Sequence, residues 1–353
     1  MASIGISSSP LPPPLASSSS SSSNKLPSHL GFVGLGVMGF AMFCNLARKV
    51  PAGSTVHFYD VNPDSMERAA REPGLVAQLD RCSCAREVAE KSEVLISMVP
   101  QGKHVRAVYL DPENGVLAAT DLSGKILLDS STIDTTTSLL VGEETRKRHG
   151  GGGAAAAAAA TFYDAPVSGG SLGARNATIT FMVGCAESDP NMPLLRELFG
   201  LMGRNTFACG GPSLGLVAKL CNNYLSFATT LANAEMFNLA IRSGMDPGIL
   251  RDILKTSSGG NRNAQVENPV PGLNPDAPAS NGYRPGFAIE YVKKDIELAM
   301  DACDRVGAKV CMGRSIRDAY LAASLHEGNA GMDSKIVYRW MGGEEDWKGK
   351  LGL

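Results

Sequence analysis

The chain has 353 residues, of which 44% are hydrophobic, and this is enough for two domains with their own cores. Its formal net charge of −2 provides no general attraction to nucleic acid or to an anionic membrane surface. No uninterrupted apolar stretch approaches the roughly 18 residues of a membrane-spanning helix, so we expect neither a nucleic-acid nor a membrane partner.

Eight cysteines are scattered along the chain, with no CxxC pair and no zinc-type spacing. Several of them lie in apolar runs. This usage is typical of buried free thiols in a reducing compartment. The sequence therefore predicts no metal site, and no cluster of His and carboxylate ligands is apparent in it.

Residues 1–27 differ from the rest in composition. They contain a proline cluster between Pro10 and Pro14 and an unbroken run from Ser17 to Ser23. Such a segment cannot bury a core, so we expect it to be disordered. The first acidic residue of the chain is Asp60, which suits an organelle-targeting peptide, whereas the absence of Arg before Arg48 favours a cytoplasmic protein.

Residues 28–210 alternate between strand and helix patterns, which indicates a doubly wound parallel sheet of the Rossmann type. Residues 150–160 interrupt the pattern with four Gly and seven Ala, and we interpret them as a low-complexity insert without function. The predicted strands are Leu30–Gly34, Thr55–Tyr59, Val94–Val99, Ile126–Leu128, Phe162–Ala165, Thr178–Val183 and Thr206–Cys209, and the first predicted helix is Val37–Val50.

Residues 211–345 contain no further strand pattern and form a second, all-helical domain in this interpretation. Apolar residues recur at spacings of three and four from Leu214 to Leu231, which predicts one long amphipathic helix. Residues 268–286 are rich in Pro, Asn and Gly and read as an ordered loop. The other predicted helical segments are Met236–Ile241, Pro247–Leu254, Tyr291–Val306 and Ile316–His326.

The sequence GLGVMG places Gly34, Gly36 and Gly39 directly after a strand and at the start of a helix. In a dinucleotide-binding turn, the first glycine permits the tight turn, the second lets the backbone approach a pyrophosphate, and the third allows close helix packing. The helix N-terminus, with Val37 and Met38, then faces the anion. A purely structural glycine turn is the alternative.

Asp60 ends the second strand, where a carboxylate can accept hydrogen bonds from the ribose hydroxyls of NAD and repel the 2′-phosphate of NADP. No Arg follows it directly, so the sequence favours NAD, although Asp60 could also be a strand-end cap. Val99 and Pro100 follow one strand and Thr132 lies after another, so these residues are expected at the ligand-binding edge of the sheet.

An apolar helix that includes GLVAKLCNNYL carries Lys219, Asn222 and Asn223. Lys219 and Asn223 are four residues apart and therefore project from one face of the helix, with Asn222 next to them. A solvent-exposed face explains an isolated lysine in a helix equally well.

The chain resembles the β-hydroxyacid dehydrogenase family, and within it the 3-hydroxyisobutyrate branch, over roughly residues 30–340. Four stretches carry the resemblance: GFVGLGVMGFAM, DAPVSGGSLGA, GLVAKLCNN, and the Pro-rich NPVPGLNPDAPASNGYRPGF followed by KKD. The first stretch is common to many Rossmann enzymes, and the second and third are typical of the family.

The resemblance implies roles for particular residues. It implies that Ser168, Gly169 and Gly170 hold the substrate carboxylate. It implies that Lys219 transfers the proton and that Asn223 binds the reacting oxygen, with Asn222 beside the substrate. It also places His104, where relatives often have Asn, and Lys294 near the cofactor. One departure is Ala177, where the family usually has Gly.

The implied reaction is oxidation of (S)-3-hydroxyisobutyrate to methylmalonate semialdehyde by NAD⁺, in mitochondrial valine catabolism. The alternatives are a sibling enzyme acting on tartronate, succinic or glyoxylic semialdehyde, a 6-phosphogluconate-type dehydrogenase, and a non-catalytic NAD-binding interaction protein. Loss of the lysine is typical of the last class, and Lys219 is present. A long exposed helix suggests a homodimer or homotetramer.

Overall fold

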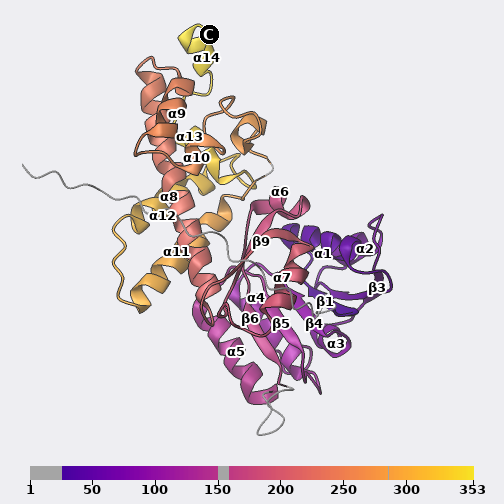
Figure 1. Ribbon diagram of the computed structural model, residues 1–353. Coiled ribbons are helices and arrows are strands. Elements are labelled where there is room, and N and C mark those ends of the chain that lie inside the picture. Colours follow the sequence, from indigo (N-terminus) through magenta and orange to yellow (C-terminus); the bar gives the residue numbers. More distant parts are fainter. Residues whose placement is uncertain (1–25, 150–158, 285) are drawn as a thin grey trace, which may run out of the picture.

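The computed structural model describes residues 26–149, 159–284 and 286–353 (Figure 1). The predicted N-terminal tail, except its last two residues, lies outside this range. So does the predicted Gly/Ala insert, except Ala159 and Ala160. No helix within the described ranges is long and apolar enough to cross a membrane.

A six-stranded, fully parallel sheet has the order β3-β2-β1-β4-β5-β6. The order reverses between β1 and β4, and ligands of such sheets bind beyond the carboxyl ends of the strands at this point. The strands are β1 (His29–Val33), β2 (Thr55–Tyr59), β3 (Gln78–Arg81), β4 (Val94–Ser97), β5 (Ile126–Asp129) and β6 (Thr161–Asp164).

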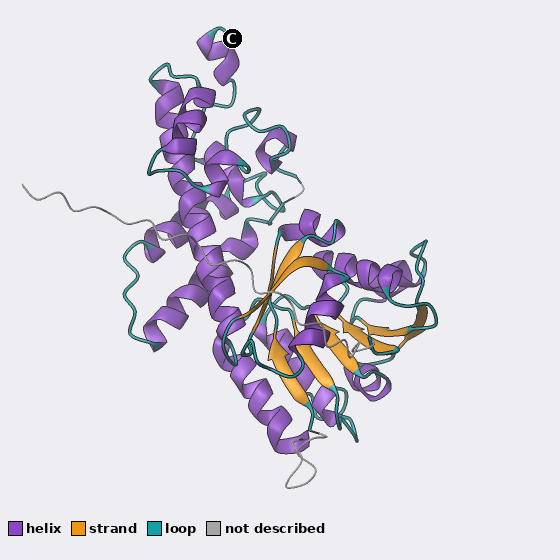
Figure 2. Ribbon diagram, in the orientation of Figure 1, coloured by secondary structure: helices purple, strands orange, loops and turns teal. Residues whose placement is uncertain are grey.

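Helices cover both faces of this sheet because successive strand residues point to opposite sides (Figure 2). Phe32 and Val56 pack with Phe43 of α1 on one face, whereas Leu95 and Val105 of α4 belong to the core on the other. The helices of this region are α1 (Val37–Lys49), α2 (Pro63–Ala70), α3 (Ala85–Lys91), α4 (Gly102–Leu110), the short η1 (Val116–Ala118) and α5 (Thr135–His149).

A second sheet of three strands follows, with the order β7-β8-β9. The sequence pattern indicated strands here but not a separate sheet, because alternation within a strand does not reveal its partner. It also missed β3, a half-exposed edge strand with the polar sequence QLDR. This part contains β7 (Val167–Ser168), α6 (Gly170–Arg175), β8 (Ile179–Val183), α7 (Met192–Gly200) and β9 (Gly203–Ala208).

The remaining described chain is helical and has a core of its own, which includes Phe237, Tyr283, Tyr320 and Tyr338. Its first helix, α8 (Leu214–Arg242), has 29 residues and runs from the sheet domain through the helical domain (Figure 1). The separate helix expected at Met236 is the end of α8. The others are α9 (Pro247–Thr256), α10 (Arg262–Gln265), η3 (Pro278–Asn281), α11 (Glu290–Arg305), α12 (Gly313–Leu325), η4 (Ser334–Ile336), α13 (Val337–Trp340) and α14 (Trp347–Leu351).

This architecture confirms the predicted fold class, a doubly wound parallel sheet followed by a helical domain.

Candidate active site

The glycine-rich turn has the backbone that its sequence predicts. Gly34 has a φ of 95°, and a Cβ there would lie 2.3 Å from the Met98 carbonyl oxygen. A Cβ on Gly39 would lie 2.0 Å from the Gly34 carbonyl oxygen, so this glycine lets α1 pack onto the turn. Gly36 faces open space instead. The two packed glycines shape the turn, and the open one leaves room for a phosphate to approach the backbone.

Asp60 lies directly beside this turn. Its Oδ2 accepts a hydrogen bond from the Leu35 N–H at 2.5 Å, and its Oδ1 accepts one from the Asn62 N–H at 2.7 Å. Arg68 of α2 donates to the Leu35 carbonyl oxygen at 3.0 Å, and its guanidinium stacks over Phe40. The half-buried carboxylate is thus fixed at the end of β2, next to the turn that would hold the pyrophosphate.

The loops after β4 and β5 meet at the same edge of the sheet. The Val99 N–H donates to the Ser131 hydroxyl at 2.9 Å, and this hydroxyl donates to the buried Asp129 carboxylate at 2.6 Å. His104 lies in the first turn of α4, and its Nδ1 is enclosed without a hydrogen-bond partner among the described residues. A buried polar atom without a partner is unusual and fits a position beside a ligand.

Helix α8 carries its polar residues where it crosses from one domain to the other. Lys219 and Asn223 are only 7% and 6% exposed, so they do not belong to a solvated face. Asn222 is more exposed, and its Nδ2 lies 3.5 Å from the Ser168 hydroxyl. The structure therefore brings the β7 motif and the α8 motif together, although about fifty residues separate them in the sequence.

The Ser-Gly-Gly motif begins in β7 and turns into α6. Ser168 ends the strand, and Gly169 and Gly170 follow with φ values of 132° and 64°. Both values favour glycine. Two such residues in succession leave the backbone N–H groups free of side chains, an arrangement suited to an anion.

The Lys219 ammonium has an unusual environment. Burial lowers the pKa of Lys219, Asp295 raises it in part and the nearby Lys294 lowers it again, and the three effects together bring it to about 8. An ordinary lysine has a pKa near 10.4 and remains protonated at neutral pH. Lys219 can therefore exchange a proton close to neutrality, as a general acid or base requires.

Asp295 of α11 is a site residue to which the sequence analysis gave no role. It is 1% exposed, and its Oδ2 accepts a hydrogen bond from Asn223 Nδ2 at 2.6 Å. Its Oδ1 forms an ion pair with Lys294 Nζ at 3.2 Å. Asp295 is the last residue of the KKD stretch, but the sequence alone cannot distinguish a buried carboxylate from a solvated one on a charged helix.

Lys294 connects the two domains. Besides pairing with Asp295, its Nζ donates to the carbonyl oxygens of Thr132 at 2.8 Å and Pro100 at 3.1 Å. Both acceptors lie in the loops that follow β4 and β5. Lys294 is therefore placed against the edge where a dinucleotide would bind.

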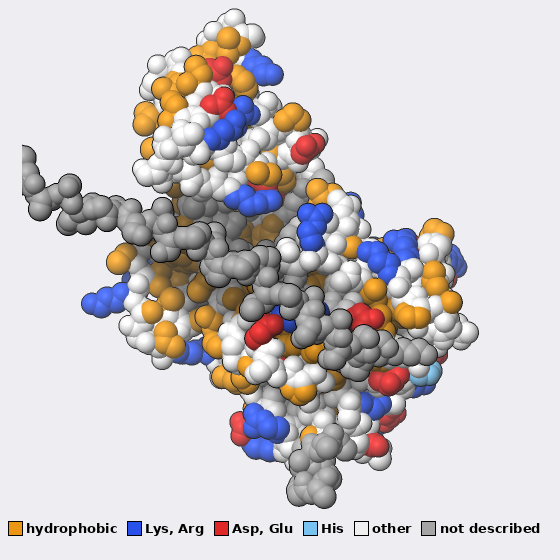
Figure 3. Space-filling model, viewed as in Figure 1, with side chains coloured by type: hydrophobic (Ala, Val, Ile, Leu, Met, Phe, Trp, Pro, Cys, Tyr) orange, Lys and Arg blue, Asp and Glu red, His pale blue; other side chains and the backbone are white. Residues whose placement is uncertain are grey.

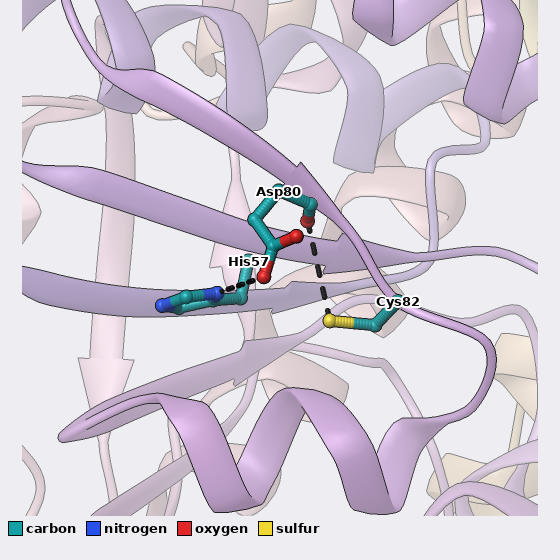
Figure 4. Close-up of side chains that lie close together, drawn as sticks. All are labelled: His57, Asp80 and Cys82. Carbon is teal, nitrogen blue, oxygen red and sulfur yellow. Dashed lines mark hydrogen bonds and ion pairs between the residues drawn. The ribbon is translucent and has the colours of Figure 1, made fainter.

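The fold also assembles a cluster that the sequence analysis did not find. His57 and Asp80 are register partners in β2 and β3, and Cys82 lies two residues beyond Asp80. Figure 4 shows the Asp80 side chain between the other two. The ligand atoms of all three lie within 4.8 Å of one another, so the expectation that His and carboxylate ligands do not gather was wrong.

The three side chains of this cluster belong to a hydrogen-bonded polar network and are poorly suited to bind a metal ion. Asp80 Oδ2 accepts from both His57 Nδ1 and Lys91 Nζ at 2.8 Å, so an ammonium already neutralises the carboxylate. Burial raises the pKa of the Cys82 thiol to about 12, which disfavours the thiolate that a metal needs. The eight cysteines are all free, and four of them are buried, whereas Cys221 and Cys311 are exposed.

A glycine turn at a switch point, a carboxylate beside it at the end of β2 and a buried lysine at the domain junction define a class. The fold and the site are those of a two-domain, NAD-dependent dehydrogenase. Two family models match the chain. The model for the NAD binding domain of 6-phosphogluconate dehydrogenase matches residues 29–211, and the model for NAD-binding of NADP-dependent 3-hydroxyisobutyrate dehydrogenase matches residues 214–341.

Individual relatives agree with these matches. The 3-hydroxyisobutyrate dehydrogenase of Pseudomonas aeruginosa is 37% identical over 319 residues, which cover 90% of this chain and 99% of the relative. The mitochondrial enzyme of that name from Rattus norvegicus is 35% identical over 323 residues, covering 92% and 89%. The solved structure of the Mycobacterium tuberculosis 3-hydroxyisobutyrate dehydrogenase with L-serine has a TM-score of 0.74 at 32% identity and covers 88% of this chain and 98% of that one.

The chain belongs to the 3-hydroxyisobutyrate dehydrogenase family, and the resemblance inferred from its motifs is confirmed.

Proposed function

We propose that this protein oxidises (S)-3-hydroxyisobutyrate to methylmalonate semialdehyde in valine catabolism. The relatives are named for this substrate, and they match the chain over most of its length. The observation that carries the proposal is Lys219, a buried lysine with its pKa lowered to about 8, on the same helical face as Asn223.

The cofactor is held by the sheet domain, residues 28–210, together with Lys294 of α11 in this proposal. NAD⁺, when bound there, would supply the acceptor for the hydride of the carbinol carbon. Gly36 leaves space for the pyrophosphate, and the enclosed His104 Nδ1 is a free polar partner for the ligand. The residues proposed to hold it are Gly34, Gly36, Val37, Met38, Gly39, Asp60, Val99, Pro100, His104, Thr132 and Lys294.

The substrate lies between the two domains in this mechanism. Ser168, Gly169 and Gly170 bind its carboxylate through a hydroxyl and backbone N–H groups. Asn223, whose Nδ2 is held by Asp295, orients the substrate hydroxyl together with Asn222. Neutral Lys219 removes the hydroxyl proton as the hydride leaves, and in the reverse direction its ammonium returns the proton.

Turnover of a substrate panel together with Lys219 variants tests the proposal. The panel contains (S)-3-hydroxyisobutyrate, glycerate, 4-hydroxybutyrate, glycolate and 6-phosphogluconate with NAD⁺. We expect the first to have the highest kcat/KM. A higher value for another acid would identify a sibling enzyme, and NADH binding without any turnover would indicate an interaction protein.

The lysine variants separate proton transfer from charge. Lys219→Ala should lower kcat by about 10² to 10⁴-fold and leave NADH affinity unchanged. Lys219→Arg should be nearly as inactive, because a guanidinium stays protonated. An arginine variant with near-normal turnover would leave Lys219 as a substrate-binding residue only.

We also propose a mitochondrial location. Relatives from Rattus norvegicus and Arabidopsis thaliana are named mitochondrial, although the Pseudomonas aeruginosa relative is bacterial. A fluorescent protein fused behind residues 1–27 should reach mitochondria, and a diffuse cytoplasmic signal would favour the alternative.

A further inference from the structure

The start of helix α8 lacks an ordinary N-terminal cap. Ser213 occupies the cap position, but its φ is 62° and its own side chain accepts no N–H from the helix. Its hydroxyl donates instead to the Thr135 carbonyl oxygen at 3.2 Å, at the beginning of α5. The first N–H groups of a helix need partners, and here they must find them outside the local sequence.

Asp164, the last residue of β6, supplies these partners. Its Oδ1 accepts from the Ser213 N–H at 2.7 Å, and its Oδ2 accepts from the Leu216 N–H at 2.9 Å. Leu216 is the third helical residue, whose N–H a local Ser or Asp cap would normally bind. A side chain about fifty residues earlier in the chain therefore performs the capping.

The neighbouring sequence leaves room for this carboxylate. A Cβ on Gly184 would lie 1.8 Å from Asp164 Oδ1, and a Cβ on Gly215 would lie 2.8 Å from Oδ2 and 2.2 Å from the Met182 carbonyl oxygen. Asp164 is 2% exposed, and burial raises its pKa to about 6 despite the two backbone donors. The carboxylate is thus held at an energetic cost in a space that only glycines provide.

We propose that Asp164 is a positioning residue for the reaction, which fixes the rotation and axial position of α8 so that Lys219 faces the substrate. Lys219 lies three residues after Leu216 and Asn223 seven residues after it, and each residue turns an α-helix by about 100°. A first turn anchored at Leu216 therefore sets the direction of both side chains. The inference rests on the proton-transfer role proposed for Lys219.

Asp164→Asn is the test, because it keeps the volume and one acceptor oxygen but places an amide NH₂ against a backbone N–H. We expect kcat to fall about 10 to 100-fold, with NADH affinity within about threefold of the unmodified enzyme. The rising limb of kcat/KM against pH should move above pH 8, because a loosened helix exposes Lys219 to solvent. A purely structural cap would lower the melting temperature but leave kcat and this limb unchanged, and that result would overturn the proposal.

Asp129→Asn is the matched control. Asp129 is the register partner of Asp164, is also buried, and also has its pKa raised to about 6. Its carboxylate accepts hydrogen bonds from the hydroxyls of Ser97 and Ser131, which adjoin the cofactor loops. This variant should weaken NADH binding and leave the pH limb in place. The same limb shift in both variants would mean a general loosening and would contradict the proposal.

Gly215→Ala provides a second variant if Asp164→Asn fails to fold. It retains the carboxylate but forces the first turn of α8 away from the Met182 carbonyl oxygen, so it should reproduce the loss of kcat and the limb shift. Unchanged kinetics would overturn the proposal. If Lys219→Arg proved active, the proton-transfer role would fail instead, a result independent of the Asp164 variants.

Discussion

Two buried lysines in this protein have opposite electrostatic environments. Lys335 forms ion pairs with Glu267 at 2.9 Å and Asp333 at 3.4 Å, and its pKa is raised even though burial opposes this. Lys219 forms no ion pair within 4 Å among the described residues, and burial lowers its pKa to about 8. The carboxylates around Lys335 stabilise its charged form, whereas the environment of Lys219 favours release of its proton.

The lowered pKa predicts the pH dependence of turnover. Oxidation needs neutral Lys219, so kcat/KM for the hydroxy acid should rise with pH and level off above about 8. Reduction of the semialdehyde needs the ammonium, so its kcat/KM should fall over the same range. Initial rates in both directions between pH 6 and 10 check this. Limbs that ran in the same direction would show that another group controls the rate.

The same group predicts a stability effect. The folded-state pKa of Lys219 is lowered from 10.5 to about 8, so protonation of this lysine disfavours the folded state. This cost is absent above pH 10.5, grows as the pH falls and is complete below pH 8. At pH 7 the cost is on the order of 3 kcal/mol. Lys219→Met should therefore raise the free energy of unfolding at pH 7, and by less at pH 9.5, in urea titrations.

Lys335→Met is the control for that experiment, because it removes the ammonium that pairs with the buried Asp333 carboxylate and should destabilise the protein. A loss of stability in both variants would contradict the cost assigned to Lys219.

Asp60 should determine the cofactor preference. NAD⁺ should be used more efficiently than NADP⁺, and Asp60→Ala should reduce the ratio by about tenfold or more, because it removes both a ribose acceptor and the repulsion of a 2′-phosphate. Asp60→Asn separates the two effects, since it retains an acceptor for the Leu35 N–H but carries no charge. Equal efficiency with both cofactors in the unmodified enzyme would contradict the role of Asp60.

At the scale of the elements, the turn between α6 and β8 shows why Gly would suit position 177 better than the Ala177 that is present. Ala177 has a φ of 52°, in the left-handed region that favours glycine. In this conformation a residue with a Cβ destabilises the folded state by roughly 1–2 kcal/mol. Glycine avoids this strain, but its larger loss of backbone entropy on folding offsets about 0.5–1 kcal/mol of the gain. Ala177→Gly should therefore stabilise the protein by about 0.5–1 kcal/mol in urea unfolding. Ala232→Gly, on the exposed side of α8, should instead destabilise it by about 1 kcal/mol.

The elements also show what a sequence can predict. The Gly34 turn, five of the six strands of the central sheet and the period of α8 are local patterns, and each was identified with its approximate bounds. The half-exposed strand β3 and the pairing of His57 with Asp80 were missed because they depend on register between distant segments. Asp295 and Asp164 were missed as site residues for the same reason: their burial and partners exist only in three dimensions.

At the scale of the whole molecule, the helical domain exposes apolar side chains to solvent (Figure 3). Leu225 and Leu239 of α8 are 62% and 57% exposed, and Ile249 of α9 is 56% exposed. Large exposed apolar patches typically mediate association. We expect a homodimer or homotetramer in solution, and Leu239→Lys should shift it toward the monomer in analytical ultracentrifugation. Val76→Lys, an exposed apolar position on the sheet domain, should leave the mass unchanged.

If helix α8 rotates about its first turn, the displacement of a residue grows with its distance from that turn. Lys219 lies five residues beyond Leu214, about 7.5 Å along the axis, whereas Arg242 lies 28 residues beyond it, about 42 Å away. A rotation of about 10° around the first turn would displace Lys219 by about 1.3 Å and the far end of the helix by about 7 Å, given this geometry. Such a rotation would therefore keep Lys219 close to the cofactor edge while it moved the far end of the helical domain much further.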